Sequence, residues 1–254
     1  MILALDIGNT NIVLGCLDEK EIYFEARLST DRNKTTAEYA VVLKNVLDVY
    51  GVDINSIDGA IMSSVVPPVN NMLKSAVHIV TGCKPLEVSV NMNHGVKMNT
   101  DNPNQLGNDI LVSLVAALDK YKTPTVIFDL GTATTIAIID GKSIFRGVCI
   151  MPGIKISQDT LTNSTSQLPA ISFDAPDNVI GTNTIDAMKS GLIFGNASMM
   201  DGMIERIEEE LGERANVIAT GGLAECVSKY CKHEIILDDS IMLHGLRLLY
   251  YKNK

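Results

Sequence analysis

The sequence predicts an α/β protein, and three observations lead to that class. Residues 3–15 and 126–139 each read as two apolar strand segments separated by an acid and a glycine. Segments whose apolar residues recur at helical spacing follow both of them. The 254 residues are 46% hydrophobic and 20% charged, which suits one large or two small folded domains. Strands that lead and helices that follow are typical of the α/β class.

The first strand segment, LALDIGNTNIVLG at residues 3–15, predicts a β-hairpin. Gly8 and Asn9 tolerate the positive φ that a tight turn requires. Taken alone, the segment explains Asp6 simply as a residue that opens a turn.

The second segment, VIFDLGTATTIAII at residues 126–139, repeats this pattern, so that Asp129 and Gly131 correspond to Asp6 and Gly8. Residues 58–66 and 215–223 are also alike, since each is an apolar strand that runs into small residues. A duplicated domain is the simplest explanation. We therefore expect two similar domains, 1–118 and 119–254.

The spacing of apolar residues predicts further helices and one long loop. Residues 105–121 form a helix that joins the two halves, with Asn108 or Asp109 available as its cap. The other expected helices are 35–50, 68–81, 183–211 and 238–251, and the expected long loop is 156–182.

Composition and charge exclude several classes of function. The net charge is −9, and lysines and arginines are scattered singly, so no basic surface for nucleic acid is expected. A phosphate ligand would need backbone amides and a metal ion instead. No apolar run approaches the ~18 residues of a membrane span, and we expect a cytoplasmic protein.

The cysteines and histidines do not indicate a disulfide framework or a nucleophilic site. The five cysteines are an odd number at irregular spacings. Cys226, Cys231 and His233 give a weak suggestion of a metal site, and ordinary burial of small thiols explains them better.

The residues themselves suggest a nucleotide site. A turn of Gly8, Asn9, Thr10 and Asn11 can present N–H and hydroxyl donors to phosphate oxygens, while Asp6 holds Mg²⁺ directly or through water. The second hairpin can do the same. The small residues at 220–222 would let a flat group such as a purine approach the backbone.

Seven motifs in order give the chain a specific resemblance. They are DIGNTNIVLG at 6–15, DNPNQLGND at 101–109, DLGTATT at 129–135, IMPG at 150–153, LP at 168–169, GTNTIDAMKSG at 181–191 and ATGG at 219–222. Over its whole length the sequence resembles type III pantothenate kinase, of the actin, Hsp70 and sugar-kinase superfamily. The resemblance implies two ribonuclease-H-like domains with a cleft for ATP between them, and phosphorylation of pantothenate, the first step towards coenzyme A.

The resemblance also implies roles for individual residues, with Asp109 as the base that faces the pantothenate hydroxyl. The expected ATP-binding residues are Asp6, Ile7, Gly8, Asn9, Thr10, Asn11, Ile12, Val13, Thr132, Gly221 and Gly222. The expected substrate-binding residues are Thr100, Gly107, Asn108, Asp109, Ile110 and Thr184.

The resemblance further implies cations and a partner subunit. Asp6 would lie near Mg²⁺, and Asp129 would bind a monovalent cation, K⁺ or NH₄⁺. Thr184 would reach the substrate of the neighbouring subunit, so the enzyme would be a homodimer that completes each site.

Asp109 has a second interpretation from its local sequence. Asn and Asp are preferred N-cap residues, so an Asn-Asp pair at the start of a helix can be explained by helix capping alone. In addition, a carboxylate with an ordinary pKa near ~3.9 is a poor base for an alcohol, so Asp109 would mainly orient the hydroxyl and accept its proton late.

Three positions depart from the family pattern, all on the substrate side. Ile110 stands where the family usually has arginine, Thr100 where it usually has tyrosine, and Gly147-Val148 where it usually has two glycines. Two alternative functions follow. One is a weakly active or non-catalytic paralogue, similar to Bvg accessory factor, that regulates transcription through a protein partner, and the other is a kinase of another small acceptor.

Overall fold

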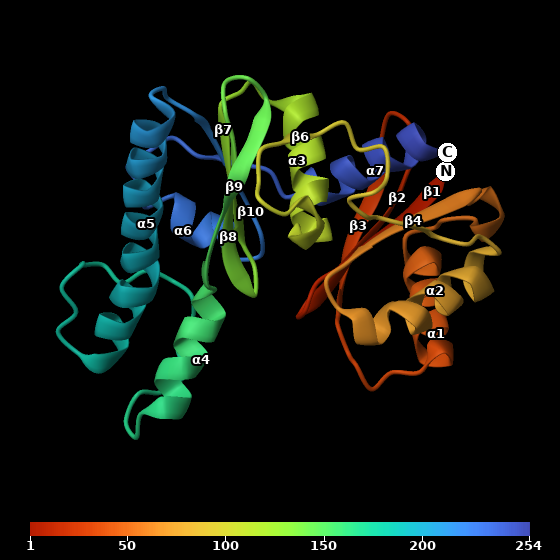
Figure 1. Ribbon diagram of the computed structural model, residues 1–254. Coiled ribbons are helices and arrows are strands. Elements are labelled where there is room, and N and C mark those ends of the chain that lie inside the picture. The colour runs from red at the N-terminus through yellow and green to blue at the C-terminus, as the bar shows by residue number, and fades with distance from the viewer. The chain divides into compact units, whose positions relative to one another are not determined.

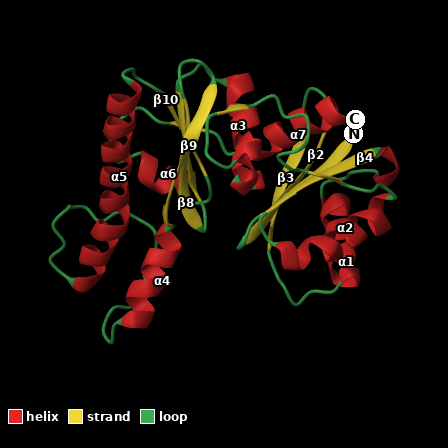
Figure 2. Cartoon of the chain, in the orientation of Figure 1, coloured by secondary structure: helices red, strands yellow, loops and turns green.

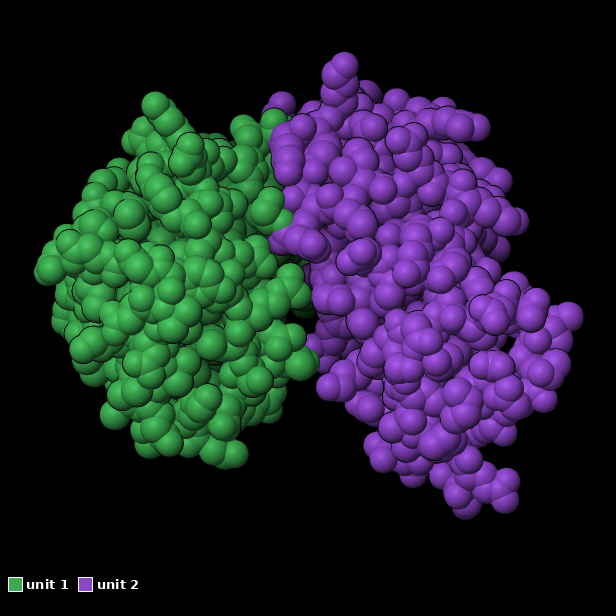
Figure 3. Space-filling model, turned by 180° about the vertical axis from the view of Figure 1, so that it is seen from behind, with its two compact units in different colours: residues 1–95, 101–119, 240–254 green, residues 96–100, 120–239 purple.

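The computed structural model describes residues 1–254, which divide into two compact units (Figure 3). Unit 1 consists of residues 1–95, 101–119 and 240–254, and unit 2 of residues 96–100 and 120–239. No helix of either unit is both long enough and apolar enough to cross a membrane.

Unit 1 contains a five-stranded sheet of order β3-β2-β1-β4-β5. The β1/β2 and β2/β3 pairs are antiparallel, whereas β4 runs parallel to β1 and β5 parallel to β4. The predicted hairpin at 3–15 is confirmed as β1 and β2. The strands are β1 Ile2–Ile7, β2 Asn11–Leu17, β3 Ile22–Ser29, β4 Gly59–Ser64 and β5 Leu86–Glu87.

Helices cover both faces of this sheet, with α1 and α2 on one side and α7 on the other (Figure 1). Leu3, Leu5 and Ile7 of β1 pack in one hydrophobic core with Leu43 of α1 and Leu73 of α2. The helices are α1 Thr36–Val49, α2 Pro67–Thr81, α3 Asn108–Lys120, whose last residue lies in unit 2, and α7 Ile241–Asn253, with 3₁₀ turns at Ile54–Ser56 and Pro103–Gln105.

Unit 2 contains a six-stranded sheet of order β11-β10-β7-β8-β9-β6. Its hairpin, predicted at 126–139, is confirmed as β7 and β8, which pair antiparallel, and β10 runs parallel to β7. The strands are β6 Lys97–Met98, β7 Thr125–Leu130, β8 Ala133–Ile139, β9 Ile144–Pro152, β10 Asn216–Thr220 and β11 Ile236–Leu237.

The helices of unit 2 are α4 Ile154–Ser164, α5 Thr184–Leu211 and α6 Ala224–Ser228 (Figure 2). Helix α4 shows that the expectation of a loop over 156–182 was wrong in its first part. Ile154 and Gln158 are buried on one side of α4, and this tertiary contact forms the helix in spite of its polar sequence. No regular element is assigned over 165–183.

The two sheets confirm the duplication that the sequence suggested. The order β3-β2-β1-β4-β5 in unit 1 matches β9-β8-β7-β10-β11 in unit 2, strand for strand and direction for direction. Asp6 and Asp129 therefore occupy the same position in their respective units.

The division of the chain differs from the continuous boundary expected at 118/119, because the C-terminal helix α7 belongs to unit 1. The reason is packing. A Cβ placed on Gly15 of β2 would lie 2.8 Å from a methyl carbon of Leu243, and one on Gly59 of β4 would lie 1.8 Å from the hydroxyl of Tyr250. Glycine at both positions lets α7 lie directly on the sheet.

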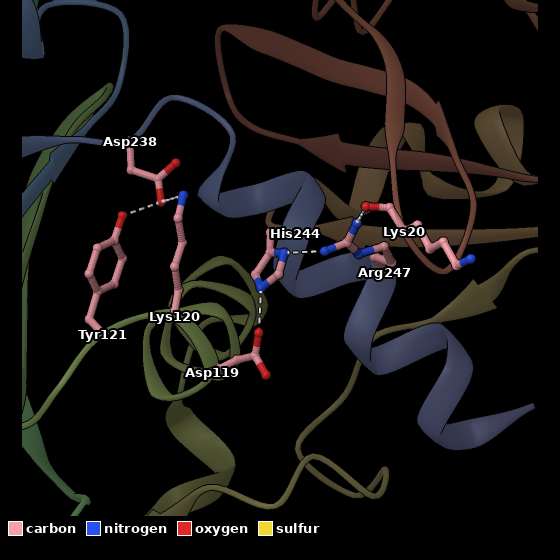
Figure 4. A network of polar contacts seen from close by, with 7 residues as sticks. All are labelled: Lys20, Asp119, Lys120, Tyr121, Asp238, His244 and Arg247. Carbon is pink, nitrogen blue, oxygen red and sulfur yellow. Dashed lines mark hydrogen bonds and ion pairs between the residues drawn. The ribbon is translucent and has the colours of Figure 1, made fainter.

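In unit 1, a polar network holds the start of α7 to the end of α3 (Figure 4). The guanidinium of Arg247 donates to His244 Nδ1 at 2.7 Å, so Nδ1 is the acceptor nitrogen of the ring. The other ring nitrogen, Nε2, therefore carries the proton and donates it to Asp119 Oδ2 at 2.8 Å. Arg247 also donates to the carbonyl oxygen of Lys20 at 2.8 Å. The chain leaves unit 1 after Asp119 and re-enters it with α7. These contacts hold Asp119 beside α7.

Unit 2 has a matching arrangement at residues 120, 121 and 238 (Figure 4). Lys120 Nζ and Tyr121 Oη both donate to Oδ2 of the buried Asp238, at 2.9 and 2.7 Å. Burial and this carboxylate raise the pKa of Tyr121, so its hydroxyl remains a donor. The start and the end of the 120–239 segment are thus held together.

Candidate functional site

In unit 1, the turn between β1 and β2 is held in one conformation by contacts from the next strand. Gly8 N–H donates to the carbonyl oxygen of Asn11 at 2.9 Å. Thr30 donates its hydroxyl to Gly8 O at 2.6 Å and its amide to Thr10 O at 2.9 Å. A Cβ on Gly8 would lie 3.1 Å from Asn11 O, so glycine allows this close turn.

The side chains at 6–13 divide into two groups. Asn9, Thr10 and Asn11 are exposed at the tip, where their amide and hydroxyl groups can meet a ligand. Ile7 and Ile12 lie in the hydrophobic core, so only their backbone can face a ligand. The carboxylate of Asp6 and the side chain of Val13 are half-buried on the opposite face of the sheet.

Arg32 is a candidate site residue that the sequence did not reveal. Its guanidinium donates to Asn9 Oδ1 at 3.1 Å and is exposed. No motif marks it, because it reaches the turn only through the pairing of β3 with β2. It brings a positive charge to the turn of an acidic protein.

The first turn of α3 positions Asp109. Leu111 N–H donates to Gly107 O at 3.0 Å, which places Gly107 at the N-cap position, just before the first residue of α3. A Cβ on Gly107 would lie 2.4 Å from Asp109 Oδ1, so glycine leaves room for the carboxylate. Asn108 Nδ2 donates to the carbonyl of Ser64 at 3.4 Å and links this turn to the end of β4.

The pKa of Asp109 is raised above its ordinary value, because burial disfavours the charged carboxylate. Hydrogen bonds from the amide of Ile110 at 2.8 Å and from its own amide offset part of this effect. Asp109 is the second residue of α3 and accepts from its own amide and the next one, whereas Gly107 holds the N-cap position that the local sequence suggested for Asn108 or Asp109. Burial makes its carboxylate more basic than an exposed aspartate.

The two departures among the expected substrate-binding residues lie in different units. Ile110 is half-buried in unit 1, with a methyl carbon 3.8 Å from the position that a Cβ on Gly107 would take. The continuous buried run of α3 begins only at Leu111. Thr100 belongs to the 96–100 segment of unit 2, where Asn99 N–H donates to Phe145 O at 2.9 Å.

In unit 2, two glycines lie close to the carboxylate of Asp129. Gly221 has a φ of +99°, and a Cβ there would lie 2.8 Å from Asp129 Oδ1. A Cβ on Gly131 would lie 3.3 Å from the same oxygen. The expected neighbours Asp129 and Gly221 are thus brought together, and Gly222 follows as an exposed residue.

Thr132 lies in the turn between β7 and β8, which packs against the end of β9. A Cβ on Gly153 would lie 2.3 Å from Thr132 O and 2.5 Å from Gly131 O. The Thr132 side chain is half-buried. The glycine of the IMPG motif thereby allows close packing of this turn.

Thr184 is the first residue of α5 and is exposed. Asn183 caps the helix by accepting from the amide of Asp186 at 3.0 Å. Large apolar side chains are exposed on the neighbouring segments, from the end of β9 to the first turn of α5. They are Ile150, Ile156, Leu161, Val179, Ile180 and Ile185.

The cysteines do not form a metal site. No group of three or more His, Cys, Asp or Glu side chains is arranged to hold a metal ion. Cys226 Sγ contacts Leu223 O and Cys231 Sγ contacts Ala197 O, and burial raises the pKa of Cys231 to about 12. Both thiols are half-buried and contact backbone carbonyl oxygens.

Comparison with known proteins identifies one family. The family model described as type III pantothenate kinase matches residues 2–206. Proteins named type III pantothenate kinase are 42% identical in an Exiguobacterium species and 41% identical in Exiguobacterium sibiricum, each over the full length of both chains. A third, from Halalkalibacterium halodurans, is 38% identical, also over both full chains.

Solved structures share the fold at low sequence identity. A Campylobacter jejuni structure described as a Baf family transcriptional activator has a TM-score of 0.59 and 20% identity, covering 99% of this chain and 98% of its own. Component A of (R)-2-hydroxyglutaryl-CoA dehydratase from Acidaminococcus fermentans has a TM-score of 0.56 and 14% identity, covering 99% and 97%. These likenesses support two ribonuclease-H-like domains.

Proposed function

This chain belongs to the type III pantothenate kinase family, which phosphorylates pantothenate in coenzyme A biosynthesis, and from that premise we propose roles for its residues. ATP is the phosphoryl donor that a kinase of this family requires. We place the reaction in the cytoplasm, where ATP is available. The assignment of the catalytic residue is carried by the position of Asp109, a half-buried carboxyl in the first turn of α3 for which Gly107 leaves room and whose pKa is raised by partial burial.

Asp109 is the base of the transfer. Its carboxylate orients the pantothenate hydroxyl and accepts the proton as the hydroxyl oxygen attacks the γ-phosphorus, while the bond from that phosphorus to the β–γ bridging oxygen breaks and ADP leaves. The product is 4′-phosphopantothenate. Because burial raises the pKa of Asp109, it is a better proton acceptor than an exposed aspartate.

The turn at residues 8–11 binds the phosphates of ATP. Its amides, the exposed hydroxyl of Thr10 and the nearby Arg32 supply donors and positive charge. In unit 2, Thr132, Gly221 and Gly222 are assigned to ATP by the resemblance. The glycines leave the backbone open to a flat base.

The donor set of unit 1 fits Mg²⁺. The carboxylate of Asp6 and the side-chain oxygens of the turn are hard ligands of the kind that Mg²⁺ prefers. When bound, Mg²⁺ neutralises charge on the phosphates. Asp6 would hold it directly or through water.

The surroundings of Asp129 fit a monovalent cation. This carboxylate lies near the end of the apolar strand β7, and a Cβ at either Gly131 or Gly221 would crowd its Oδ1, so the two glycines leave room beside it for an ion. A half-buried charge there is stabilised by K⁺ or NH₄⁺. Activity should rise when Na⁺ is replaced by K⁺ or NH₄⁺ at constant ionic strength, and Asp129→Ala should abolish that difference. Equal rates in the three salts would contradict the assignment.

The assignments of Asp6 and Asp109 are separated by steady-state kinetics. Asp109→Asn should lower kcat by roughly 10²–10⁴-fold with little change in the KM for Mg·ATP. Asp6→Asn should raise the KM for Mg·ATP and the Mg²⁺ requirement, because it removes charge beside the metal. Asp101→Asn, an exposed change just before α3, is the control. Unaltered kcat in Asp109→Asn would remove Asp109 from the catalytic role.

A homodimer completes the site through Thr184. The exposed apolar side chains between β9 and α5, among them Ile180 at 82% exposure, supply a surface that a second subunit would cover. Thr184 is exposed at the first residue of α5, next in sequence to the exposed Ile185.

Subunit complementation tests this arrangement. Asp109→Asn and Thr184→Ala homodimers should each be impaired. After subunit exchange, one site of every mixed dimer carries both changes and the other carries neither, so about a quarter of wild-type activity should return. No recovery from a mixture shown to exchange subunits would contradict a shared site.

A further inference from the structure

Ser63 carries the one buried side-chain oxygen or nitrogen of unit 1 that has no hydrogen-bond partner. The residue is fully buried near the end of β4. Buried hydroxyl groups are ordinarily paired, and an unpaired one destabilises the fold. Alanine would fill nearly the same space without this cost, so the presence of serine needs an explanation.

The Ser63 side chain lies on the same face of the sheet as Asp6. The two residues are directly opposite in the parallel pairing of β1 with β4. Met62 packs in the core with α1 and α2, so Ser63, one residue further along the strand, faces the other side. Gly59, four residues before Ser63, contacts Tyr250 of α7, which confirms the direction.

The first turn of α3 is bound to the end of β4. Asn108 donates to the carbonyl of Ser64, which binds the turn that carries Asp109 to the residue after Ser63. In the same region, Val65 N–H donates to Ile7 O at 3.1 Å, so the ends of β1 and β4 are held together. The Ser63 hydroxyl therefore lies among the residues that would handle phosphate and acceptor.

Unit 2 repeats the pairing of an acid with a hydroxyl. Asp129 of β7 is directly opposite Thr220 of β10, in the strands that correspond to β1 and β4. Thr220 is also buried. A hydroxyl beside the acid is thus present in both copies of the duplicated fold, at equivalent positions.

We propose that Ser63 is a positioning residue, whose hydroxyl donates to the Asp6 carboxylate when Mg·ATP is bound. The inference rests on the proposed role of Asp6. The hydrogen bond orients the carboxylate towards the metal and its waters. The Ser63 hydroxyl, which has no partner within the protein, then finds one in the carboxylate when the nucleotide is bound.

The experiment compares Ser63→Ala and Ser63→Thr with wild type by thermal melting and by calorimetric titration of ATP with and without Mg²⁺. Ser63→Ala should melt at or slightly above the wild-type temperature, because it removes an unpaired polar group. It should bind Mg·ATP roughly tenfold more weakly, as expected for loss of a hydrogen bond to a charged group. Binding of ATP without Mg²⁺ should not change, and Ser63→Thr should restore Mg·ATP affinity.

Two controls separate the possible explanations. Ser113→Ala removes a hydroxyl that donates to Ile110 O at 2.8 Å, so its melting temperature should fall where that of Ser63→Ala does not. Asp6→Asn distinguishes this inference from the role on which it rests. If Asp6→Asn weakens Mg·ATP binding and Ser63→Ala does not, the role of Ser63 is overturned and that of Asp6 stands.

If neither variant changes Mg·ATP binding, the proposed role of Asp6 fails, and the inference fails with it. A Ser63→Ala protein with a lowered melting temperature and wild-type affinity would show a merely structural serine, which also overturns the inference. Should Ser63→Ala not fold, Ser63→Cys keeps the size of the side chain without a strong donor, and the same criteria apply.

Discussion

At the scale of single residues, burial of Asp109 has a consequence for stability. Because burial raises the pKa of this carboxyl in the folded state, the fold binds its proton more tightly than the unfolded chain does. Its contribution to stability is therefore fully present below the ordinary carboxyl range and is lost as the pH rises through the raised pKa.

Asp109→Asn, which cannot ionise, should accordingly gain stability relative to wild type as the pH rises. The difference in melting temperature should be smallest below about pH 4 and should increase towards pH 7. Thermal melts across this range measure it, with Asp101→Asn as the exposed control. A difference that stays constant with pH would show that burial does not perturb Asp109.

Ile110 decides whether the missing arginine weakens substrate binding. It is half-buried beside Gly107 and precedes the continuous buried run of α3, so we expect that a longer side chain can reach solvent. Ile110→Arg should fold and lower the KM for pantothenate by roughly tenfold or more, through a charge-assisted contact with its carboxylate. Ile110→Gln tests length without charge. A folded arginine variant with an unchanged KM would mean that this protein binds the carboxylate by other residues.

At the scale of secondary-structure elements, the contact between β10 and the end of β7 depends on Gly221. Its positive φ and its closeness to Leu130 and Asp129 both exclude a side chain. Gly221→Ala should lower the free energy of unfolding by about 2 kcal/mol or more. Gly212 also has a positive φ, of +75°, but no atom within 4 Å, so Gly212→Ala should cost less. Denaturant titration compares the two, and equal losses would show that strain alone matters.

An element could be predicted from the sequence when local sequence signals specify it, and could not when contacts with distant elements stabilise it. The hairpins and α1, α2, α3, α5 and α7 were predictable, because turn residues and apolar spacing are local signals. Helix α4 was not, since the contacts that Ile154 and Gln158 make with other elements stabilise it. Among the candidate site residues, Asp6 and Asp129 stood out through the repeat. Arg32 and Ser63 did not, because pairing between strands brings them to the site.

At the scale of the whole molecule, unit 1 depends on a segment that follows unit 2 in the chain. Leu243 of α7 is fully buried and lies against Gly15 of β2. Leu243→Ala should cost about 2–5 kcal/mol and should reduce hydrogen-exchange protection mainly in residues 1–95. Ile204→Ala, at a fully buried position of α5, is the matched control and should affect residues 120–239. Equal loss of protection in both units would contradict this assignment of α7.

The position of α7 also sets the order in which the newly made chain can be completed. Residues 120–239 must be synthesised before α7 exists, which takes about 6–24 s at ~5–20 residues per second. During that interval the β1–β4 face that α7 will cover has no partner, and its apolar side chains are open to chaperones or to other nascent chains. A premature stop near residue 240 would leave every proposed site residue in place and still remove the helix that unit 1 needs to close its core.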